Sequence, residues 1–463
     1  MLTYDLERRG DLPRYDYLYR CIKGDILSGR LAAGEKLPSK RALAAHLGTA
    51  VVTVENAYAQ LLAEGYLTSR ERSGCYVAQV ETRQSPPPPP ASVQAVPERR
   101  WLLDLRGVGS GIEGFPFSVW AKLTRQVLTE RGPALLRAVP HSGVPELRRA
   151  LARHLYELRG IQVSPEQIVV GAGTEYLYSV LIQLLGRQWG YAVEDPGYLR
   201  LSKIYEKNDV VTYHIPMDQA GIIPEKLEES GAEILHSTPS HHFPTGIVMP
   251  VSRRYEFLSW ASKGENRYII EDDYDCEFRL AGRPIPTLQS IDVMEKVIYI
   301  NTFSKSLAPA FRISYLVLPK HLVTRFYETL GFYSGTVSCL EQMTLARFLS
   351  EGYFEKHINR MRNHYRALRD KLLLALRQSP LAGRVKISEE HAGLHFLLEL
   401  DTQRSDEEIL QAAQAQDLRI SFVSQYYVAA QNRRPHVLVM NYSGLEEEKV
   451  EEAVSRLCRA VLG

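Results

Sequence analysis

The sequence predicts an α/β protein in two parts, a small domain of helices with a hairpin and a large domain built on a mainly parallel sheet. Three observations support this prediction. The chain has 463 residues, which is too many for one ordinary domain. A proline-rich stretch interrupts it at residues 82–100. Beyond that stretch, short apolar runs alternate with helical segments, as in sheets whose parallel strands are joined by helices.

Composition excludes several classes of protein. Hydrophobic residues make up 45% and charged residues 24%, so the chain as a whole is not disordered. The net charge of +2 gives no indication of a nucleic-acid or membrane partner. No apolar run reaches the roughly 18 residues of a membrane helix, and the first ten residues do not resemble a secretion signal. The five cysteines are scattered without a CxxC pair, as expected of free thiols in a reducing cytoplasm.

The N-terminal part, residues 1–81, predicts three helices and a hairpin. Apolar residues recur at helical spacing in residues 17–27. A second helix follows Ser39 as N-cap and stops at Gly48, and a third lies within residues 49–65. Residues 66–77 alternate strand, turn and strand. This order is typical of a winged helix-turn-helix, and the alternative is a small docking domain with no DNA role.

The run GEKLPSKRALAAHLG…TVENAYAQLLAEGYL…RSGCYV resembles the GntR family of bacterial DNA-binding domains over residues 15–79. In that family the second helix, the recognition helix and the wing meet the DNA. One departure is Ala50-Val51, where the family usually has Ser-Arg, so we expect weaker or differently specific binding. The resemblance implies DNA contacts by Ser39, Lys40, Arg41, Thr53, Asn56, Arg70, Arg72 and Gly74.

Residues 82–100 contain five consecutive prolines, at 86–90. Proline cannot donate a backbone hydrogen bond and favours an extended polyproline helix. We interpret the stretch as a linker that could span on the order of 60 Å, rather than as a surface loop within one domain. The linker separates the N-terminal part from a large domain over residues 101–463.

In the large domain, polar residues gather where predicted strands end, which is where such sheets bind ligands. The first group is Asn301-Thr302-Phe303-Ser304-Lys305 with Arg312, which suits a Schiff-base lysine beside a bound phosphate. The second is Glu271-Asp272-Asp273-Tyr274-Asp275, where a carboxylate could pair with a protonated pyridine nitrogen, or three aspartates could hold a metal. The other two groups are a glycine-rich helix start at 171–175 and Pro196-Gly197-Tyr198-Leu199-Arg200.

The order and spacing of these groups resemble fold-type I aminotransferases, which bind pyridoxal 5′-phosphate (PLP), over about residues 105–463. The resemblance implies that Lys305 carries the internal aldimine, that Asp272 meets the pyridine nitrogen, that Tyr274 meets the phenolic oxygen and that Tyr198 stacks on the ring. It also implies a phosphate site made by Thr174, Thr302, Ser304 and Arg312, together with backbone amides near Gly173 and Glu175.

A GntR-like reader linked to an aminotransferase-like body resembles the MocR subfamily of transcription regulators. Phe243 supports this, because it stands before Pro244 where aminotransferases place an asparagine that bonds the cofactor. Val439 occupies the position of the arginine that binds a substrate α-carboxylate. We therefore expect either that Arg200, or an arginine at 433 or 434, substitutes for it, or that the effector is not an ordinary α-amino acid.

The predicted function is a cytoplasmic, DNA-binding transcription regulator that senses an amino compound, or PLP itself, through an aldimine at Lys305. The resemblance implies a homodimer in which the DNA-binding domain of each subunit lies over the large domain of the partner subunit. We expect no membrane and no metal; the adjacent residues His241 and His242 are interpreted as structural. The alternatives are an active aminotransferase with an accessory module and a structural regulator that does not bind PLP.

Overall fold

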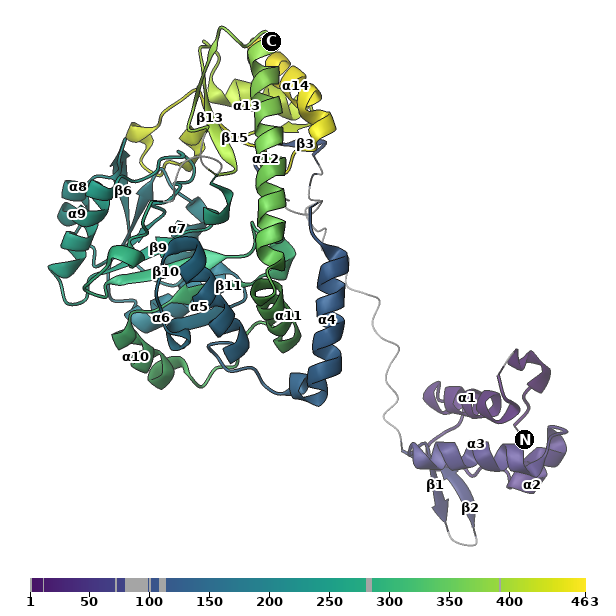
Figure 1. The fold of residues 1–463 in the computed structure, drawn as a ribbon. Helices are drawn as coiled ribbons and strands as arrows, with labels where there is room; N and C mark the ends of the chain where they lie inside the picture. Colours follow the sequence, from purple (N-terminus) through teal and green to yellow (C-terminus); the bar gives the residue numbers. More distant parts are fainter. Residues whose placement is uncertain are drawn as a thin grey trace. The chain divides into compact units, whose positions relative to one another are not determined.

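The computed structural model describes residues 2–10, 12–70, 73–79, 99, 101–107, 114–279, 285–390 and 393–463. Most of the predicted linker lies outside these residues, and so does Arg72. The chain divides into two compact units, residues 1–99 and 100–463 (Figure 1). Within the described residues, no helix has the length and apolar character needed to cross a membrane.

The N-terminal unit is a winged helix-turn-helix, as predicted. Ser39 caps the second helix by accepting a hydrogen bond of 3.2 Å from the Ala42 amide, so the predicted N-cap is confirmed. Leu18, Leu43 and Tyr58 bring the three main helices into one core. The elements are η1 (Leu6–Arg9), α1 (Arg14–Leu27), α2 (Lys40–His46), α3 (Val51–Ala63) and the antiparallel strands β1 (Leu67–Arg70) and β2 (Gly74–Val77).

The C-terminal unit is built on a mainly parallel sheet, which confirms the predicted α/β fold. Its described strands lie in the order β4-β11-β10-β9-β8-β5-β6-β7, with β11 antiparallel to both of its neighbours. The bounds are β4 (Ile168–Gly171), β5 (Tyr191–Asp195), β6 (Thr212–Asp218), β7 (Gly221–Ile222), β8 (Ile234–Ser237), β9 (Tyr268–Asp272), β10 (Val297–Thr302) and β11 (Ser314–Val317).

Helices cover both faces of this sheet, which explains why its central strands begin with apolar residues on both faces. On β10, Ile298 and Ile300 pack into the cluster formed with α6 and α10, while Val297 and Tyr299 point to the other side. Alternate residues of a strand face opposite sides, so both sets are buried. The helices are α5 (Pro145–Arg159), α6 (Thr174–Leu185), α7 (Leu199–Lys207), α8 (Pro224–Ser230), α9 (Val251–Ser262) and α10 (Lys320–Leu330).

A smaller C-terminal layer lies against one end of the sheet unit. The long helix α12 runs from the region of α11 to a second sheet made of β12, β13 and β15 (Figure 1). The bounds are β3 (Leu103–Asp104), α4 (Phe117–Arg131), α11 (Cys339–Ser350), α12 (Tyr353–Gln378), β12 (Val385–Ser388), β13 (His395–Leu400), α13 (Asp406–Ala415), β14 (Leu418–Arg419), β15 (Val437–Asn441) and α14 (Val450–Leu462). Short 3-10 helices are η2 (Gly132–Leu136), η3 (Pro165–Gln167), η4 (Cys276–Phe278), η5 (Gln289–Ile291), η6 (Pro309–Phe311), η7 (Val423–Tyr426), η8 (Ala430–Asn432) and η9 (Glu447–Lys449).

Candidate functional site

The carboxyl ends of β5, β8, β9 and β10 open onto a cavity of about 440 Å³ in the C-terminal unit. Such an edge is where open α/β sheets bind their ligands. The structure brings ten residues predicted from sequence to the wall of this cavity: Thr174, Glu175, Tyr198, Arg200, Asp272, Tyr274, Thr302, Ser304, Lys305 and Arg312.

Lys305 lies in the turn that follows β10. Burial lowers the pKa of its amine, and the nearby Asp275 carboxylate only partly opposes this effect. A lowered pKa increases the fraction of neutral amine, which is the nucleophilic form. Lys305 is therefore suited to attack a carbonyl group in the cavity.

Groups that could bind an anion surround the start of α6. Gly173 precedes the helix with φ +90°, and a Cβ at this position would overlap the Arg312 guanidinium. The bare backbone thus lets the Arg312 guanidinium lie beside the free amides of the helix start. Opposite, Ser314 Oγ donates to Thr302 Oγ1 at 2.8 Å, and Thr302 Oγ1 donates to Ser304 Oγ at 2.9 Å.

Glu175 provides the negative charge at this site in the structure. Its Oε2 accepts a hydrogen bond of 3.1 Å from Arg312 Nη2, and its Oε1 accepts one of 2.9 Å from Arg200 Nη1. The resemblance implied an anion contact only for the backbone of Glu175. In the structure its carboxylate instead occupies Arg312 Nη2, a donor that an anion at this site could use.

Asp272 presents a buried carboxylate oxygen to the cavity. Its Oδ2 accepts a hydrogen bond of 2.6 Å from the Tyr178 hydroxyl and lies 3.6 Å from His236 Nε2. His236 Nδ1 is in turn hydrogen-bonded to the Tyr205 hydroxyl at 2.6 Å. Asp272 Oδ1 is buried and has no hydrogen-bond partner among the described residues. A buried acceptor without a partner is costly, so this oxygen suits a donor brought by a ligand.

Three neighbouring aspartates were one possible metal site, but they point to different partners. Asp273 pairs with Arg159 at 3.1 Å, and Asp275 Oδ2 lies 2.7 Å from His241 Nδ1. The described part of the chain contains no group of three His, Cys, Asp or Glu placed to hold a metal ion.

His241 contributes to the polar surroundings of Tyr274, whose hydroxyl lies 3.4 Å from His241 Nδ1. Burial raises the pKa of Tyr274 well above its usual value, so its hydroxyl stays protonated.

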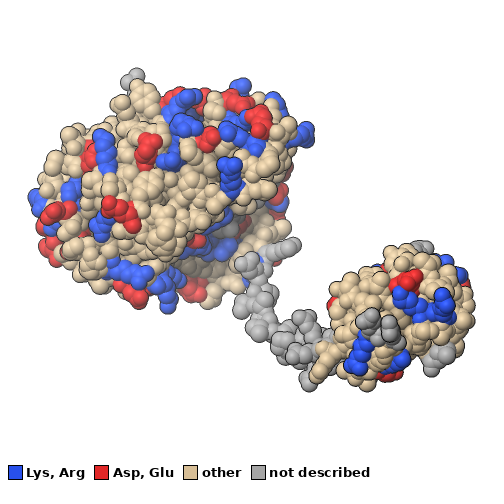
Figure 2. Space-filling view, turned by 90° about the horizontal axis from the view of Figure 1, so that it is seen from below, with Lys and Arg blue, Asp and Glu red and all other residues tan. Residues whose placement is uncertain are grey.

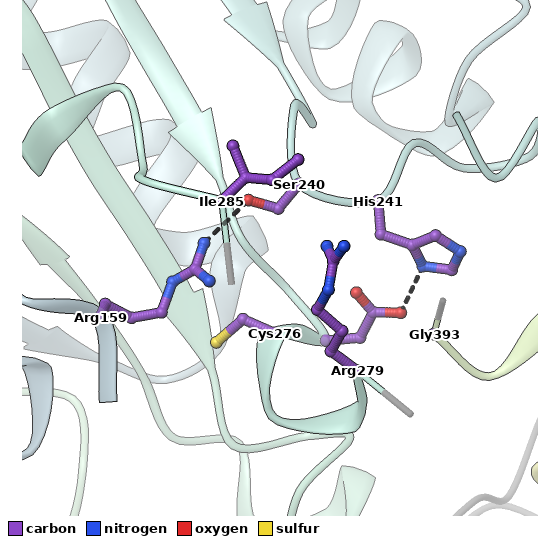
Figure 3. Close-up of a pocket in the computed structure, with 8 residues that line it drawn as sticks. Arg159, Ser240, His241, Cys276, Arg279, Ile285 and Gly393 are labelled. Atoms are coloured by element: carbon purple, nitrogen blue, oxygen red, sulfur yellow. Dashed lines mark hydrogen bonds and ion pairs between the residues drawn. The ribbon is translucent and has the colours of Figure 1, made fainter. Parts of the chain in front are cut away.

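A second, much smaller hollow lies beside the His241–Asp275 pair (Figure 3). Arg159 extends across it and donates a hydrogen bond of 3.0 Å to Ser240 Oγ. Its volume of about 20 Å³ is enough for about one water molecule. This hollow is therefore too small for an organic ligand.

One wall of the large cavity is aromatic and apolar. Phe243 precedes the cis-bonded Pro244 and packs edge-on against Tyr426, with ring centroids 5.0 Å apart. Val439 of β15 is buried in the same apolar cluster but does not line the cavity itself. Asn441, two residues further along β15, lines the cavity. Val439, at the position where aminotransferases have a carboxylate-binding arginine, therefore presents an aliphatic side chain.

Of the three arginines considered as substitutes for the one missing at Val439, only one lies at the cavity. Arg200 lines the cavity, whereas Arg434 pairs with Glu399 at 3.0 Å, and neither Arg433 nor Arg434 lines it. Arg106 also lines the cavity, although no motif in the sequence indicates it, and it forms a β-bridge with the distant Asn441. Other missed cavity residues are Tyr178, Glu194, His236, His395 and Tyr426. Of these, only Tyr178 could have been predicted from local spacing, because it lies one helical turn after Thr174 and therefore on the same face of α6.

The residues predicted to contact DNA lie on α2, α3 and the hairpin of the N-terminal unit. Lys40 Nζ pairs with Glu55 at 2.6 Å, and the Arg70 guanidinium lies 4.6 Å from the Tyr76 ring centroid. Figure 2 shows Lys and Arg side chains together with Asp and Glu side chains on one face of this unit. The remaining positions are Ser39 at the start of α2, Arg41 on α2, Thr53 and Asn56 on α3, and Gly74 at the start of β2 with φ +110°.

Comparisons with known proteins agree with this division. Residues 14–77 match the "Bacterial regulatory proteins, gntR family", and residues 109–457 match "Aminotransferase class I and II". The chain is 39% identical to the "Uncharacterized HTH-type transcriptional regulator YdeL" of Bacillus subtilis, over 98% of both chains. It is 32% identical to the "Probable rhizopine catabolism regulatory protein MocR" of Rhizobium meliloti, over 99% of this chain and 95% of that one. An archaeal alanine:glyoxylate aminotransferase has the same fold, with a TM-score of 0.70 and 22% identity over 79% of this chain and 91% of its own.

Proposed function

The chain belongs to the MocR subfamily of GntR-family transcription regulators, and from this premise we propose that its C-terminal cavity holds PLP and senses an amine or PLP itself. The N-terminal unit binds DNA, and the C-terminal unit has an aminotransferase fold that serves regulation. The observation that carries the cofactor proposal is the unpartnered Asp272 Oδ1 in a cavity that also contains Lys305.

The residues present fit PLP at three separate points. Asp272 offers an acceptor for a protonated ring nitrogen, and Lys305 offers an amine of lowered pKa. Gly173 and Arg312 form an anion cradle that a Cβ at Gly173 would obstruct. We infer that the phosphate is held by Thr174, Thr302, Ser304, Arg312 and the amides of residues 174 and 175, and that Tyr198 covers the ring. The Gly173 amide already donates to the Gly171 carbonyl at 2.8 Å. When bound, PLP supplies an electrophilic carbonyl that reacts reversibly with amines.

The chain's own groups prepare this chemistry. Tyr178 and His236 surround Asp272 Oδ2 and fix the carboxylate, which leaves Oδ1 as the oxygen available to a ligand. The Tyr274 hydroxyl is protonated and can donate a hydrogen bond to a phenolate oxygen. Lys305 can release or accept a proton at Nζ near neutral pH more readily than an exposed lysine can.

We propose a sensor rather than an efficient enzyme, because two positions lack groups that catalysis uses. Phe243 cannot donate a hydrogen bond from its side chain, and Val439 cannot bind a carboxylate. The second candidate function is a working aminotransferase, which the fold of the C-terminal unit favours. We further propose that the protein is a cytoplasmic homodimer with exchanged N-terminal units, which would read two half-sites.

The test is a visible absorbance titration of the full-length protein with PLP, together with Lys305→Ala. Lys320→Ala is the matched control, because Lys320 is exposed and pairs with Glu295 at the start of α10. The readout is a protein-dependent absorbance band that differs from the band of free PLP. Its presence in the wild type and in Lys320→Ala, with its absence in Lys305→Ala, supports the proposal. Its absence in the wild type refutes the proposal.

Candidate amines are then added while DNA affinity and keto-acid turnover are followed. A change in the band and in DNA affinity without turnover supports an amine sensor. A band that no amine alters, accompanied by a PLP-dependent change in DNA affinity, identifies PLP as the effector. Sustained turnover of an amino acid and a keto acid establishes the aminotransferase instead.

A further inference from the structure

The first residues of the third helix form a small apolar surface. We define the α3 head as Ala50, Val51 and Val52; all three are exposed, Val51 to 42% and Val52 to 58%. The core of the N-terminal unit takes Val54, Ala57 and Tyr58 from the same helix and none of the α3 head. The α3 head therefore lies outside the hydrophobic core.

Local helix stability does not explain these residues either. Ala50 occupies the N-cap of α3 without a side-chain hydrogen bond, where Ser, Thr, Asp or Asn would satisfy a free amide. Valine is a β-branched residue and a poor helix former. Three residues that neither cap the helix nor fill the core are best explained by contact with a partner.

The position of the α3 head identifies that partner as the major groove of DNA. In a helix-turn-helix, the N-terminal residues of the recognition helix contact base edges. An uncharged aliphatic side chain offers nothing to a phosphate, but it packs against the C5-methyl group of thymine. One turn further on the same exposed face lies Asn56, which can form two hydrogen bonds to adenine. Both types of contact select A·T pairs.

The charges around the α3 head are compatible with this docking. Glu55, one turn after Val51, is the acidic residue on the exposed side of α3 nearest the head. Its carboxylate is paired with Lys40 Nζ at 2.6 Å. The pair reduces the repulsion that Glu55 would otherwise exert on the DNA backbone.

We propose that Val51 and Val52 read thymine methyl groups, so that each operator half-site contains A·T pairs beneath the α3 head. This inference rests on the proposed DNA-binding function. Because the contact involves a methyl group, it can be tested by replacing single thymines with uracil, which lacks only that methyl.

The experiment begins with selection of bound sequences from a random DNA library by the full-length protein. Each thymine of the selected half-site is then replaced by uracil, and affinity is measured by fluorescence anisotropy at fixed salt. We expect one or two positions at which uracil weakens binding about fivefold, the effect of removing one buried methyl-sized contact. In Val51→Ala/Val52→Ala, the ratio of thymine to uracil affinity at those positions should fall to about one.

Leu27→Ala is the matched control, because Leu27 is an exposed aliphatic residue at the end of α1. It should keep the wild-type response to uracil, and circular dichroism should show that both variants fold. Indifference of the wild type to uracil at every position overturns the thymine inference and leaves DNA binding intact. A uracil response that persists in the double variant also overturns it. Failure to select any sequence contradicts the DNA-binding function itself, and the inference with it.

Discussion

Replacing Glu175 with glutamine tests whether this carboxylate competes with a bound phosphate. Glu175 lies at the start of α6 and accepts hydrogen bonds from Arg312 at 3.1 Å and from Arg200 at 2.9 Å. A phosphate bound at the same helix start would need Arg312 as its own partner. Glu175→Gln keeps the size of the side chain and removes its charge. We therefore expect PLP to bind more tightly to the variant.

The size of the effect follows from the exposure of the ion pair. The side chains of Glu175 and Arg312 are 40% and 47% exposed. Ion pairs of this exposure contribute about 0.2–1 kcal/mol. Releasing Arg312 should thus favour phosphate by about 1 kcal/mol, which corresponds to about a fivefold lower Kd for PLP. The stability of the protein without PLP should change little.

The assay is the same absorbance titration, performed on full-length wild type, Glu175→Gln and Glu228→Gln. Glu228 is a matched control, because it is 49% exposed and pairs with Arg267 at 2.8 Å on an unrelated surface. We expect a lower Kd for Glu175→Gln alone, with the difference shrinking as salt is raised. A Kd that rises or stays unchanged in Glu175→Gln would refute the competition, and so would an equal gain in Glu228→Gln.

Three further predictions follow from the buried groups. Asp272→Asn should raise the Kd for PLP about tenfold, because an amide is a weaker partner than a carboxylate for a protonated ring nitrogen; an unchanged titration would argue against that contact. Gly173→Ala should weaken PLP binding and lower the free energy of unfolding by about 1–2 kcal/mol, because its φ is +90° and its Cβ would meet Arg312; urea unfolding measures the loss. Burial lowers the pKa of His154 to about 4, so the unfolded chain binds more protons than the folded one at pH 5. Stability should therefore fall by about 2 kcal/mol from pH 7 to pH 5 through this group, and His154→Gln should lose about that much less in urea unfolding at the two pH values.

Local signals explain which parts of the fold could be predicted from the sequence. The N-cap at Ser39 and the apolar runs of the parallel strands indicate their elements without reference to distant residues. The direction and neighbours of strand β11 could not be predicted in this way. It lies antiparallel between β4 and β10, and a short apolar run carries no information on strand direction or neighbours.

The candidate site shows the same limit. Asp272 ends β9 and Lys305 lies in the turn after β10, so both lie at one edge, because parallel strands end on the same side. By contrast, Arg106 and Asn441 reach the cavity through a bridge between segments more than 300 residues apart in the sequence. The carboxylate of Glu175 was overlooked for another reason: its partners, Arg200 and Arg312, are set by packing rather than by spacing.

The apolar wall constrains how a ligand can be oriented in this cavity. Phe243 packs into an apolar cluster with Val439, so this part of the wall offers no charge to an acidic ligand. An acidic group must then be bound by the arginines that line the cavity, which are Arg106, Arg200 and Arg312. Arg200 and Arg312 are both paired with Glu175, at 2.9 Å and 3.1 Å. We therefore predict that a ligand carboxylate binds Arg106 or displaces Glu175, whereas a neutral or apolar amine packs against Phe243 and leaves both ion pairs intact.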